Sequence, residues 1–222
     1  MHALREKFQS SAAYARVAPF VIFVALLLFQ GQFGDASLYW VYLLRTLVGA
    51  WLIWEMRPFV PEMRWAFSWE AVVAGVVLFV MWVVIDPYYP QSKGTGPDWN
   101  PIAFFGAGTA VSWAFMAARV AGMTLVVPPL EEVFWRSFLY RWFVRTDFQN
   151  MPFNRFHPTS FIVTSALFGA EHHQWLAGVL YGFAMQGLVI RKNRIGDAMT
   201  AHAVTNFLLG VYVCRTGQWQ FF

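Results

Sequence analysis

Long apolar runs separated by short polar turns dominate the chain, and none alternates polar and apolar residues with a period of two. That pattern favours membrane helices over a membrane β-barrel. Apolar runs that predict helices lie at 17–33, 38–56, 71–85, 102–127, 161–170, 175–190 and 195–213, and a further helix is expected from 131 to about 144. We therefore predict an all-α, polytopic transmembrane bundle of about eight helices, six or seven of which span the membrane.

The first apolar run, from Val17 to Phe29, has the length of a signal-peptide core. No small-x-small cleavage site follows, and the apolar character continues to Phe33, so we expect a retained first helix.

Composition supports a membrane protein. Hydrophobic residues make up 58% of the 222 positions and charged residues 13%, against roughly a quarter charged in soluble domains; the mean hydropathy is +0.46. We expect one integral membrane domain over residues 1–222, with motif-free helices in 1–101 and the motif-bearing helices in 102–215. The single cysteine, Cys214, has no partner for an internal disulfide and no metal-binding spacing around it.

The net charge of +4 resides in short loops, so the basic residues indicate orientation and no nucleic-acid partner is expected. The basic segments are the N-terminus and residues 57–64, 141–155 and 191–194, and all four are expected on the cytoplasmic side. Segment 102–145 must then cross an odd number of times, which predicts a re-entrant or interfacial part near Arg119 or after the prolines. The polar stretch 86–98 predicts an exposed loop.

Two features predict contacts within the bundle. Arg45 lies inside the second apolar run and is expected to pair with another polar group there. Gly178 and Gly182 form a small-x-x-x-small pair that permits close helix packing.

The most unusual stretch is Pro128-Pro129-Leu130-Glu131-Glu132, followed by Arg136. The prolines must break or restart the helix, so the Glu-Glu motif is expected to open a new one. Glu132 and Arg136 are four residues apart, in the order that favours pairing. Glu131 points about 100° away and is free for chemistry. The structural alternative is that both acids only favour the positive end of a helix dipole.

Two later helices carry further polar groups. Phe168, Glu171, His172 and His173 lie at the end of one, and His202 and Asn206 share a face of another. Adjacent histidines point in different directions, so at most one of His172 and His173 is expected to join a site. Capping histidines and a structural His–Asn hydrogen bond are the alternatives. Together, however, a carboxylate beside one histidine can activate water, while a second histidine and an amide stabilise an oxyanion.

The motifs Glu131-Glu132-x-x-x-Arg136, Phe168-x-x-x-His172 and His202-x-x-x-Asn206 resemble those of the CAAX protease and bacteriocin-processing (CPBP, or Abi) family of membrane proteases. The resemblance covers about residues 119–213. It implies that Glu131 and His172 activate water, that His202 and Asn206 form the oxyanion site, and that Glu132 and Arg136 support them. Trp135-Arg-Ser-Phe-Leu and Thr216-Gly-Gln-Trp-Gln-Phe-Phe also resemble exosortase-associated bacterial members.

The apolar runs and basic loops predict a multi-pass membrane protein with a cytoplasmic N-terminus, and the resemblance implies a protein of the bacterial inner membrane that acts as an endopeptidase on a membrane-associated or lipidated peptide. It identifies neither that peptide nor an oligomeric state. We favour hydrolysis without a cofactor.

Three alternatives stay open. Glu131, His172 and His202 are a possible zinc ligand set with an open position for water, although no His-Glu-x-x-His motif is present. The chain is otherwise a non-catalytic membrane protein that binds a peptide, such as an immunity protein. A proton-coupled transporter is the third alternative, but the sequence lacks an internal repeat.

Overall fold

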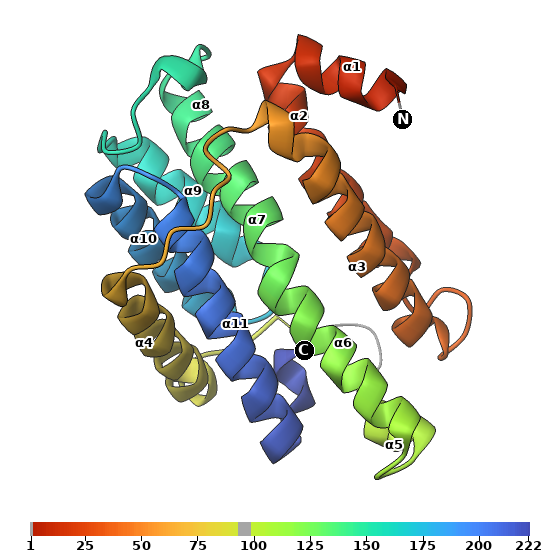
Figure 1. Cartoon of the computed structure of the whole chain (residues 1–222). Coiled ribbons are helices and arrows are strands. Elements are labelled where there is room, and N and C mark those ends of the chain that lie inside the picture. Colours follow the sequence, from red (N-terminus) through yellow and green to blue (C-terminus); the bar gives the residue numbers. More distant parts are fainter. Residues whose placement is uncertain (1, 93–98) are drawn as a thin grey trace.

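The computed structural model describes residues 2–92 and 99–222, and helices account for all the regular structure within these ranges (Figure 1). The α-helices are α1 (His2–Ser10), α2 (Ala12–Ala25), α3 (Ser37–Met56), α4 (Trp69–Ile85), α5 (Pro101–Phe105), α6 (Ala110–Leu125), α7 (Val127–Glu132), α8 (Tyr140–Val144), α9 (Pro158–Ala170), α10 (Trp175–Lys192) and α11 (Gly196–Thr216). Short 3-10 helices are η1 (Leu26–Phe29), η2 (Arg57–Phe59), η3 (Asp86–Tyr88), η5 (Phe148–Asn150) and η6 (Trp219–Phe221), and η4 (Val133–Leu139) is a π-helix.

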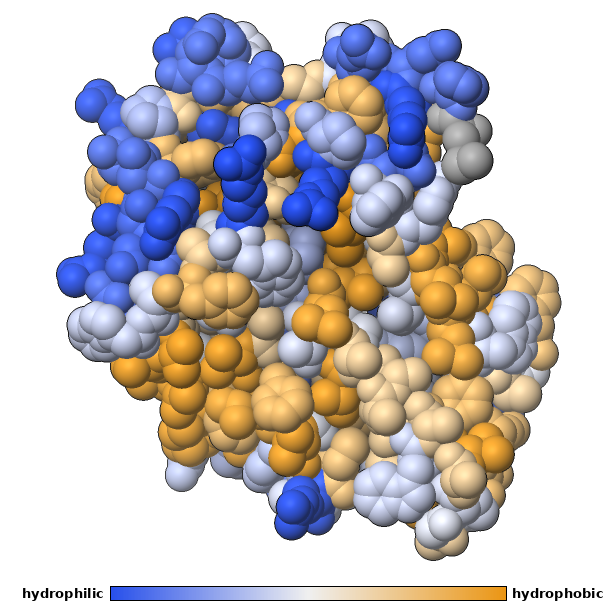
Figure 2. Space-filling model, in the orientation of Figure 1, coloured by the Kyte–Doolittle hydropathy of each residue, from blue (hydrophilic) through white to orange (hydrophobic). Residues whose placement is uncertain are grey.

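Four segments of the described chain are long and apolar enough to cross a membrane. They are Ala12–Phe29, Ser37–Phe59, Trp69–Tyr88 and Ala110–Val144. Many large apolar side chains point outward, and Figure 2 shows apolar surface over the lower part of the molecule and hydrophilic surface at its upper end. The predicted all-helical membrane architecture is confirmed, whereas the predicted total of about eight helices with six or seven spans stays a prediction.

Helices α6, α7, η4 and α8 follow one another as one long rod through the bundle (Figure 1). The predicted proline break is present but occupies only Val126, whose backbone stays in the right-handed helical region. Pro128 and Pro129 lie in the first turn of α7, where a missing N–H costs little. The chain therefore keeps its direction, and 110–144 forms a single candidate span. The new helix begins at Val127, four residues before Glu131, and the re-entrant or interfacial part expected within 102–145 stays a prediction.

Helix α11 is the central element, since it packs against α4, α6, α7 and α10. Helices α9 and α10 form a closely packed pair, as the two glycines predicted. A Cβ added to Gly178 would lie 2.8 Å from the Cα of Gly169, and one added to Gly182 would lie 2.9 Å from the Cα of Ser165. Helix α2 packs on α3, α7 and η4 and closes the opposite side.

The four basic segments meet at one end of the bundle, the end of α1 and α8 in Figure 1. Asn154 N–H donates to Asn193 Oδ1 at 3.0 Å, which joins segment 141–155 to segment 191–194. Arg16 lies 2.7 Å from Glu62, and Arg141 and Ser137 contact the same carboxylate. A single membrane face for all four segments fits this arrangement, and its assignment as cytoplasmic stays a prediction.

The expected loop at 86–98 is described as far as residue 92, and 93–98 lie outside the described residues. Its first part packs over the start of α10. Ser92 N–H donates to His173 O at 3.1 Å, and Trp175 Nε1–H donates to Pro90 O at 2.8 Å.

We predict that Gly182→Ala destabilises the protein and that Gly187→Ala, in the same helix, does not. The new methyl group at 182 meets the backbone of α9, and such overpacking costs roughly 1–3 kcal/mol. Nothing lies within 4 Å of a Cβ at Gly187, so alanine there gains helix propensity without a clash. Thermal unfolding in detergent measures both, and equal unfolding midpoints for the two variants would contradict the close α9–α10 contact.

We predict that acid weakens the fold partly through Glu62. Burial alone would raise the pKa of Glu62, but the hydrogen bonds and charge of Arg16, together with Ser137, lower it below its ordinary 4.5. The contribution to stability is therefore complete above about pH 4.5 and is lost as the pH falls through the folded-state pKa. Unfolding measured from about pH 6 to about pH 3 should show a shallower acid dependence in Glu62→Gln. If the free energy of unfolding of Glu62→Gln depends on pH as steeply as that of the wild type, Glu62 does not contribute to the acid sensitivity.

Candidate active site

A cavity of about 340 Å³ lies between the helices and brings together side chains from both halves of the chain. Its walls come from α2, α3, α4, α6, α7, α9, α10 and α11, the loop after α9 and residues 220–222. The four residues predicted to carry the chemistry all line it: Glu131, His172, His202 and Asn206. Its volume is within the range of roughly 300–1,000 Å³ usual for small-molecule pockets.

Glu132 is fully buried beside the cavity-lining Glu131. One of its carboxylate oxygens contacts both Arg136 on η4 and His202 on α11. Its Oε1 accepts a hydrogen bond from Arg136 Nη1 at 3.1 Å, which is the pairing that the four-residue spacing predicted. The same oxygen lies 2.9 Å from His202 Nδ1 on α11, a contact that sequence spacing does not reveal. The guanidinium of Arg136 also lies 4.4 Å from the centre of the Phe168 ring on α9. Glu132 therefore fixes α7 against α11, and Arg136 extends the contact to α9.

The π-helix η4 begins directly after Glu132 and carries both Trp135 and Arg136. The wider π turn is uncommon in proteins and occurs frequently at functional sites. Here Trp135 Nε1–H donates to Glu171 Oε1 at 3.2 Å, so η4 contacts the end of α9 as well as Glu132. The residue pattern alone does not distinguish this segment from an ordinary α-helix.

Glu131, Glu171 and His172 form a compact cluster in the cavity, with one ligand atom of each within 4.8 Å of the others. For three atoms that are at most 4.8 Å apart, there is a point no more than about 2.8 Å from each atom, because 4.8 Å divided by √3 is about 2.8 Å. A distance of about 2.8 Å is a normal hydrogen-bond length for water. Within the described ranges, Glu131 Oε2 is buried without a hydrogen-bond partner. A water molecule at that point would lie within hydrogen-bonding distance of all three groups.

The orientation of His172, which lies just after α9, is set by the last turn of that helix. Its Nδ1 lies 2.7 Å from the carbonyl oxygen of Phe168. A carbonyl only accepts, so Nδ1 carries the hydrogen and Nε2 has a free lone pair in the neutral ring. The rings of Phe168 and Trp82 pack against the imidazole, with centres 4.7 and 5.4 Å away. His172 is thus held as a proton acceptor.

His202 and Asn206 approach the cluster from α11. His202 Nε2 lies 3.9 Å from Glu131 Oε2, too far for a hydrogen bond, while its Nδ1 faces Glu132. Asn206 Nδ2 donates one hydrogen to Met123 O at 2.7 Å, which leaves its second hydrogen free. The ring of Tyr181 lies edge-on to His202, with centres 5.4 Å apart.

The structure adds a residue to which sequence analysis gave no role. Glu171 takes the place beside Glu131 and His172 that the zinc alternative had assigned to His202. The neighbouring His173 also lines the cavity but is not part of the cluster. The helical spacing in the sequence gives no information on the role of Glu171, because the position of this residue depends on how α9 packs against η4.

This fold and site define an integral membrane protein in which an acid–histidine site lines a cavity between the helices. Residues 113–208, from α6 into α11, match the Rce1-like family, which is described as type II CAAX prenyl endopeptidase Rce1-like. The matched segment covers less than half of the 222 residues and contains all three motifs on which the resemblance to this family was predicted. The match supports a protease-like membrane enzyme. No curated protein and no solved structure matches the chain.

We predict that Glu131→Gln and Glu132→Gln differ in their effect on stability. Glu132→Gln removes the charge opposite Arg136 and His202 at full burial, and breaking a buried pair costs about 3–5 kcal/mol. Glu131 makes no hydrogen bond through its buried Oε2, so its amide variant should unfold close to the wild-type temperature.

Thermal unfolding in detergent compares the two variants. Glu132→Gln combined with Arg136→Met is the control and should recover part of the loss, because no uncompensated guanidinium then stays buried. Equal losses in Glu131→Gln and Glu132→Gln would remove the basis for assigning the two acids different roles.

Proposed function

We propose that the chain is an intramembrane endopeptidase that hydrolyses a peptide bond in a membrane-associated or lipidated peptide. Glu131 and His172 activate the water, and His202 and Asn206 stabilise the oxyanion. The observation that carries this proposal is that the water-sized cluster of Glu131, Glu171 and His172 shares one cavity with His202 and Asn206. The Rce1-like match over 113–208 supports the same reaction class.

In the proposed reaction, a water molecule lies between Glu131 and His172 and is positioned by both. Glu131 takes one proton as the water oxygen attacks the peptide carbonyl carbon, and the carbonyl oxygen becomes an oxyanion. Collapse of the tetrahedral intermediate breaks the C–N bond, and the proton held by Glu131 passes to the leaving nitrogen. The products are a carboxylic acid and an amine, with no covalent enzyme intermediate.

Stabilisation of the oxyanion requires hydrogen-bond donors. The free hydrogen of the Asn206 amide is one. His202 is the other in its doubly protonated form, because Nδ1–H donates to Glu132 and only a second proton makes Nε2 a donor. The negative charge of Glu132 stabilises that imidazolium. Glu132 and Arg136 therefore act on the chemistry through His202 without touching the substrate.

A metal-assisted version is the second candidate, and the Glu131–Glu171–His172 cluster is the observation that favours it. Two carboxylates and one imidazole are ligands that zinc accepts, with a water in the fourth position. These three residues would hold the ion, which would supply Lewis-acid activation of the water when bound. Proteolysis that is abolished by a strong chelator and restored by zinc would favour this version over the metal-independent one.

A non-catalytic peptide-binding protein is the alternative from another class. The bacterial inner membrane, with the N-terminus cytoplasmic, is the proposed location. The meeting of four basic segments at one end of the bundle supports that orientation.

We predict that Glu131→Gln abolishes cleavage without unfolding the protein. Loss of a general base lowers a rate by roughly 10²–10⁴-fold. Membrane peptides from cells with wild-type protein are compared by mass spectrometry with those from Glu131→Gln cells, at matched protein levels. Arg145→Gln, which changes an exposed ion pair with Asp147, is the control and should retain wild-type cleavage. Identical peptides in wild-type and Glu131→Gln cells would contradict the protease and favour the peptide-binding alternative.

A further inference from the structure

Two arginines that the proposed chemistry does not use also line the cavity. Arg45 reaches it from α3 and Arg119 from α6. Arg45 is only 6% exposed, and its Nε has no hydrogen-bond partner in the described part of the chain. Within residues 2–92 and 99–222, neither guanidinium forms an ion pair, which corrects the expectation that Arg45 pairs within the bundle.

Aromatic rings hold both guanidinium groups in place. Arg45 lies 4.6 Å from the centre of the Phe23 ring and 5.3 Å from that of Tyr42. Arg119 lies 4.5 Å from the Tyr42 ring and 5.0 Å from the Trp99 ring. Packing against a ring face satisfies part of the charge but uses none of the N–H donors at the edge of the guanidinium plane. Each arginine is therefore positioned with donors to spare.

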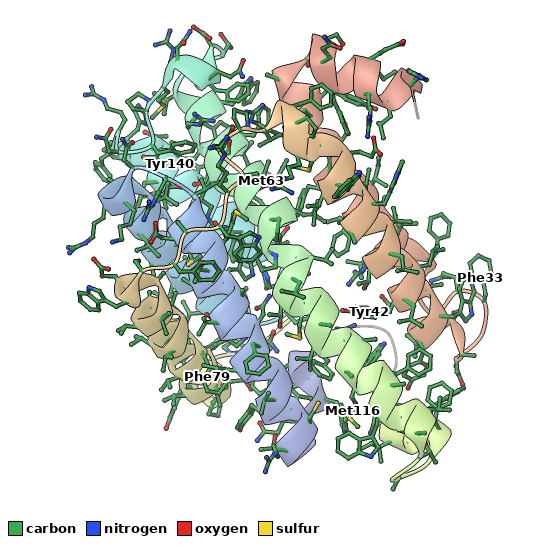
Figure 3. All side chains as sticks on the ribbon, viewed as in Figure 1. Phe33, Tyr42, Met63, Phe79, Met116 and Tyr140 are labelled. Carbon is green, nitrogen blue, oxygen red and sulfur yellow. The ribbon has the colours of Figure 1, made fainter. Side chains whose placement is uncertain are left out.

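Tyr42, labelled in Figure 3, packs against both arginines and joins their helices. Its hydroxyl donates to the backbone carbonyl of Arg119 at 3.0 Å, and the absence of a side chain at Gly122 makes room for it, since a Cβ there would lie 2.5 Å from the hydroxyl oxygen. The spacing of Arg45 and Arg119 is thus set by a specific contact between α3 and α6.

Two cations in an apolar bundle are costly unless something compensates them. The acids Glu131 and Glu171 border the same cavity and provide long-range compensation, but they form no contact pair with either arginine. A purely structural role would leave the spare donors unused. An anion bound in the cavity would satisfy them directly.

We propose that Arg45 and Arg119 form a subsite that binds a carboxylate of the substrate peptide. This inference rests on the proposed function and names the chemical feature by which that site selects its substrate. A planar carboxylate matches the paired N–H donors of a guanidinium group. Two guanidinium groups packed against the same tyrosine ring present such donors to the same cavity.

The size of the cavity limits the distance between the bound carboxylate and the peptide bond that is cut. Arg45, Arg119 and Glu131 all border one volume of about 340 Å³, and an extended peptide advances roughly 3.3–3.6 Å per residue. The carboxylate therefore lies within a few residues of the bond that is cut. It is either a free carboxy terminus or an acidic side chain near that bond. A phospholipid headgroup in this subsite would compete with the peptide for the space beside Glu131.

Binding and cleavage are tested separately with a prenylated, fluorescently labelled peptide in three forms. One has a free carboxy terminus, one has a terminal amide, and one has a terminal amide with a glutamate added near the end. Dissociation constants are measured in nanodiscs with Glu131→Gln protein, which binds without cutting. Arg45→Gln and Arg119→Gln are added to this background, with Arg45→Lys as the charge-conserving variant and Arg145→Gln as the exposed control.

The proposal predicts that a carboxylate form binds at least about tenfold more tightly than the plain amide. The two cavity variants should lose that preference, Arg45→Lys should keep part of it, and Arg145→Gln should keep all of it. The glutamate form shows whether the carboxylate must be terminal. Unfolding midpoints confirm that each variant is folded.

Equal binding of carboxylate and amide peptides would overturn the subsite, as would a cavity variant that weakens both forms equally. A further result would also overturn the subsite. Anionic lipid would stabilise the wild-type protein but not Arg45→Gln, and neither protein would prefer carboxylate peptides, which would show that the arginines bind a lipid headgroup. Cleavage by protein with Glu131 intact keeps the two proposals distinct. Cleavage without carboxylate preference supports the protease and contradicts the subsite, whereas preference without cleavage supports the subsite and contradicts the protease.

Discussion

One oxygen of Glu132 accepts hydrogen bonds from Arg136 and from His202, and the remaining geometry of the site depends on this buried contact. It joins the long α6–α8 rod to the central helix α11 deep inside the bundle. Buried charges are tolerated only when they are paired and hydrogen-bonded. The Glu132 carboxylate faces the Arg136 guanidinium and the His202 ring, so it is paired at full burial.

The groups proposed to carry the chemistry lie on α7, on α11 and directly after α9, and contacts between these elements hold them. The position of Glu131 is fixed by that of Glu132, because the two are neighbours on α7. His202 is oriented by Glu132, and His172 by the carbonyl of its own helix and by the Trp82 and Phe168 rings. The proposed hydrolysis requires a place for water inside the apolar bundle, and one ligand atom each of Glu131, Glu171 and His172 lies within 4.8 Å of the others in the cavity. The arginines of α3 and α6 form another part of the same cavity.

Much of this could be predicted from local spacing. Helical periodicity places Glu132 opposite Arg136, the glycine pair indicates the close approach of α10 to α9, and the three motifs identify the Rce1-like segment. Features that depend on packing between distant helices could not be predicted. The spacing carries no information on the contact of His202 with Glu132, on the position of Glu171 or on the packing of Arg45 against aromatic rings. The prolines were overinterpreted, because their first-turn position lets the rod continue.

The central claim is that a water molecule at Glu131 and His172 attacks the peptide carbonyl directly. A single-turnover reaction of purified protein with a prenylated peptide in ¹⁸O-labelled water tests it most directly, with mass spectrometry of both the product and the protein. The account predicts one ¹⁸O atom in the new carboxylate of the product and none in Glu131. Transfer of the label to the Glu131 side chain, with unlabelled product, would reveal a covalent acyl intermediate and contradict the account.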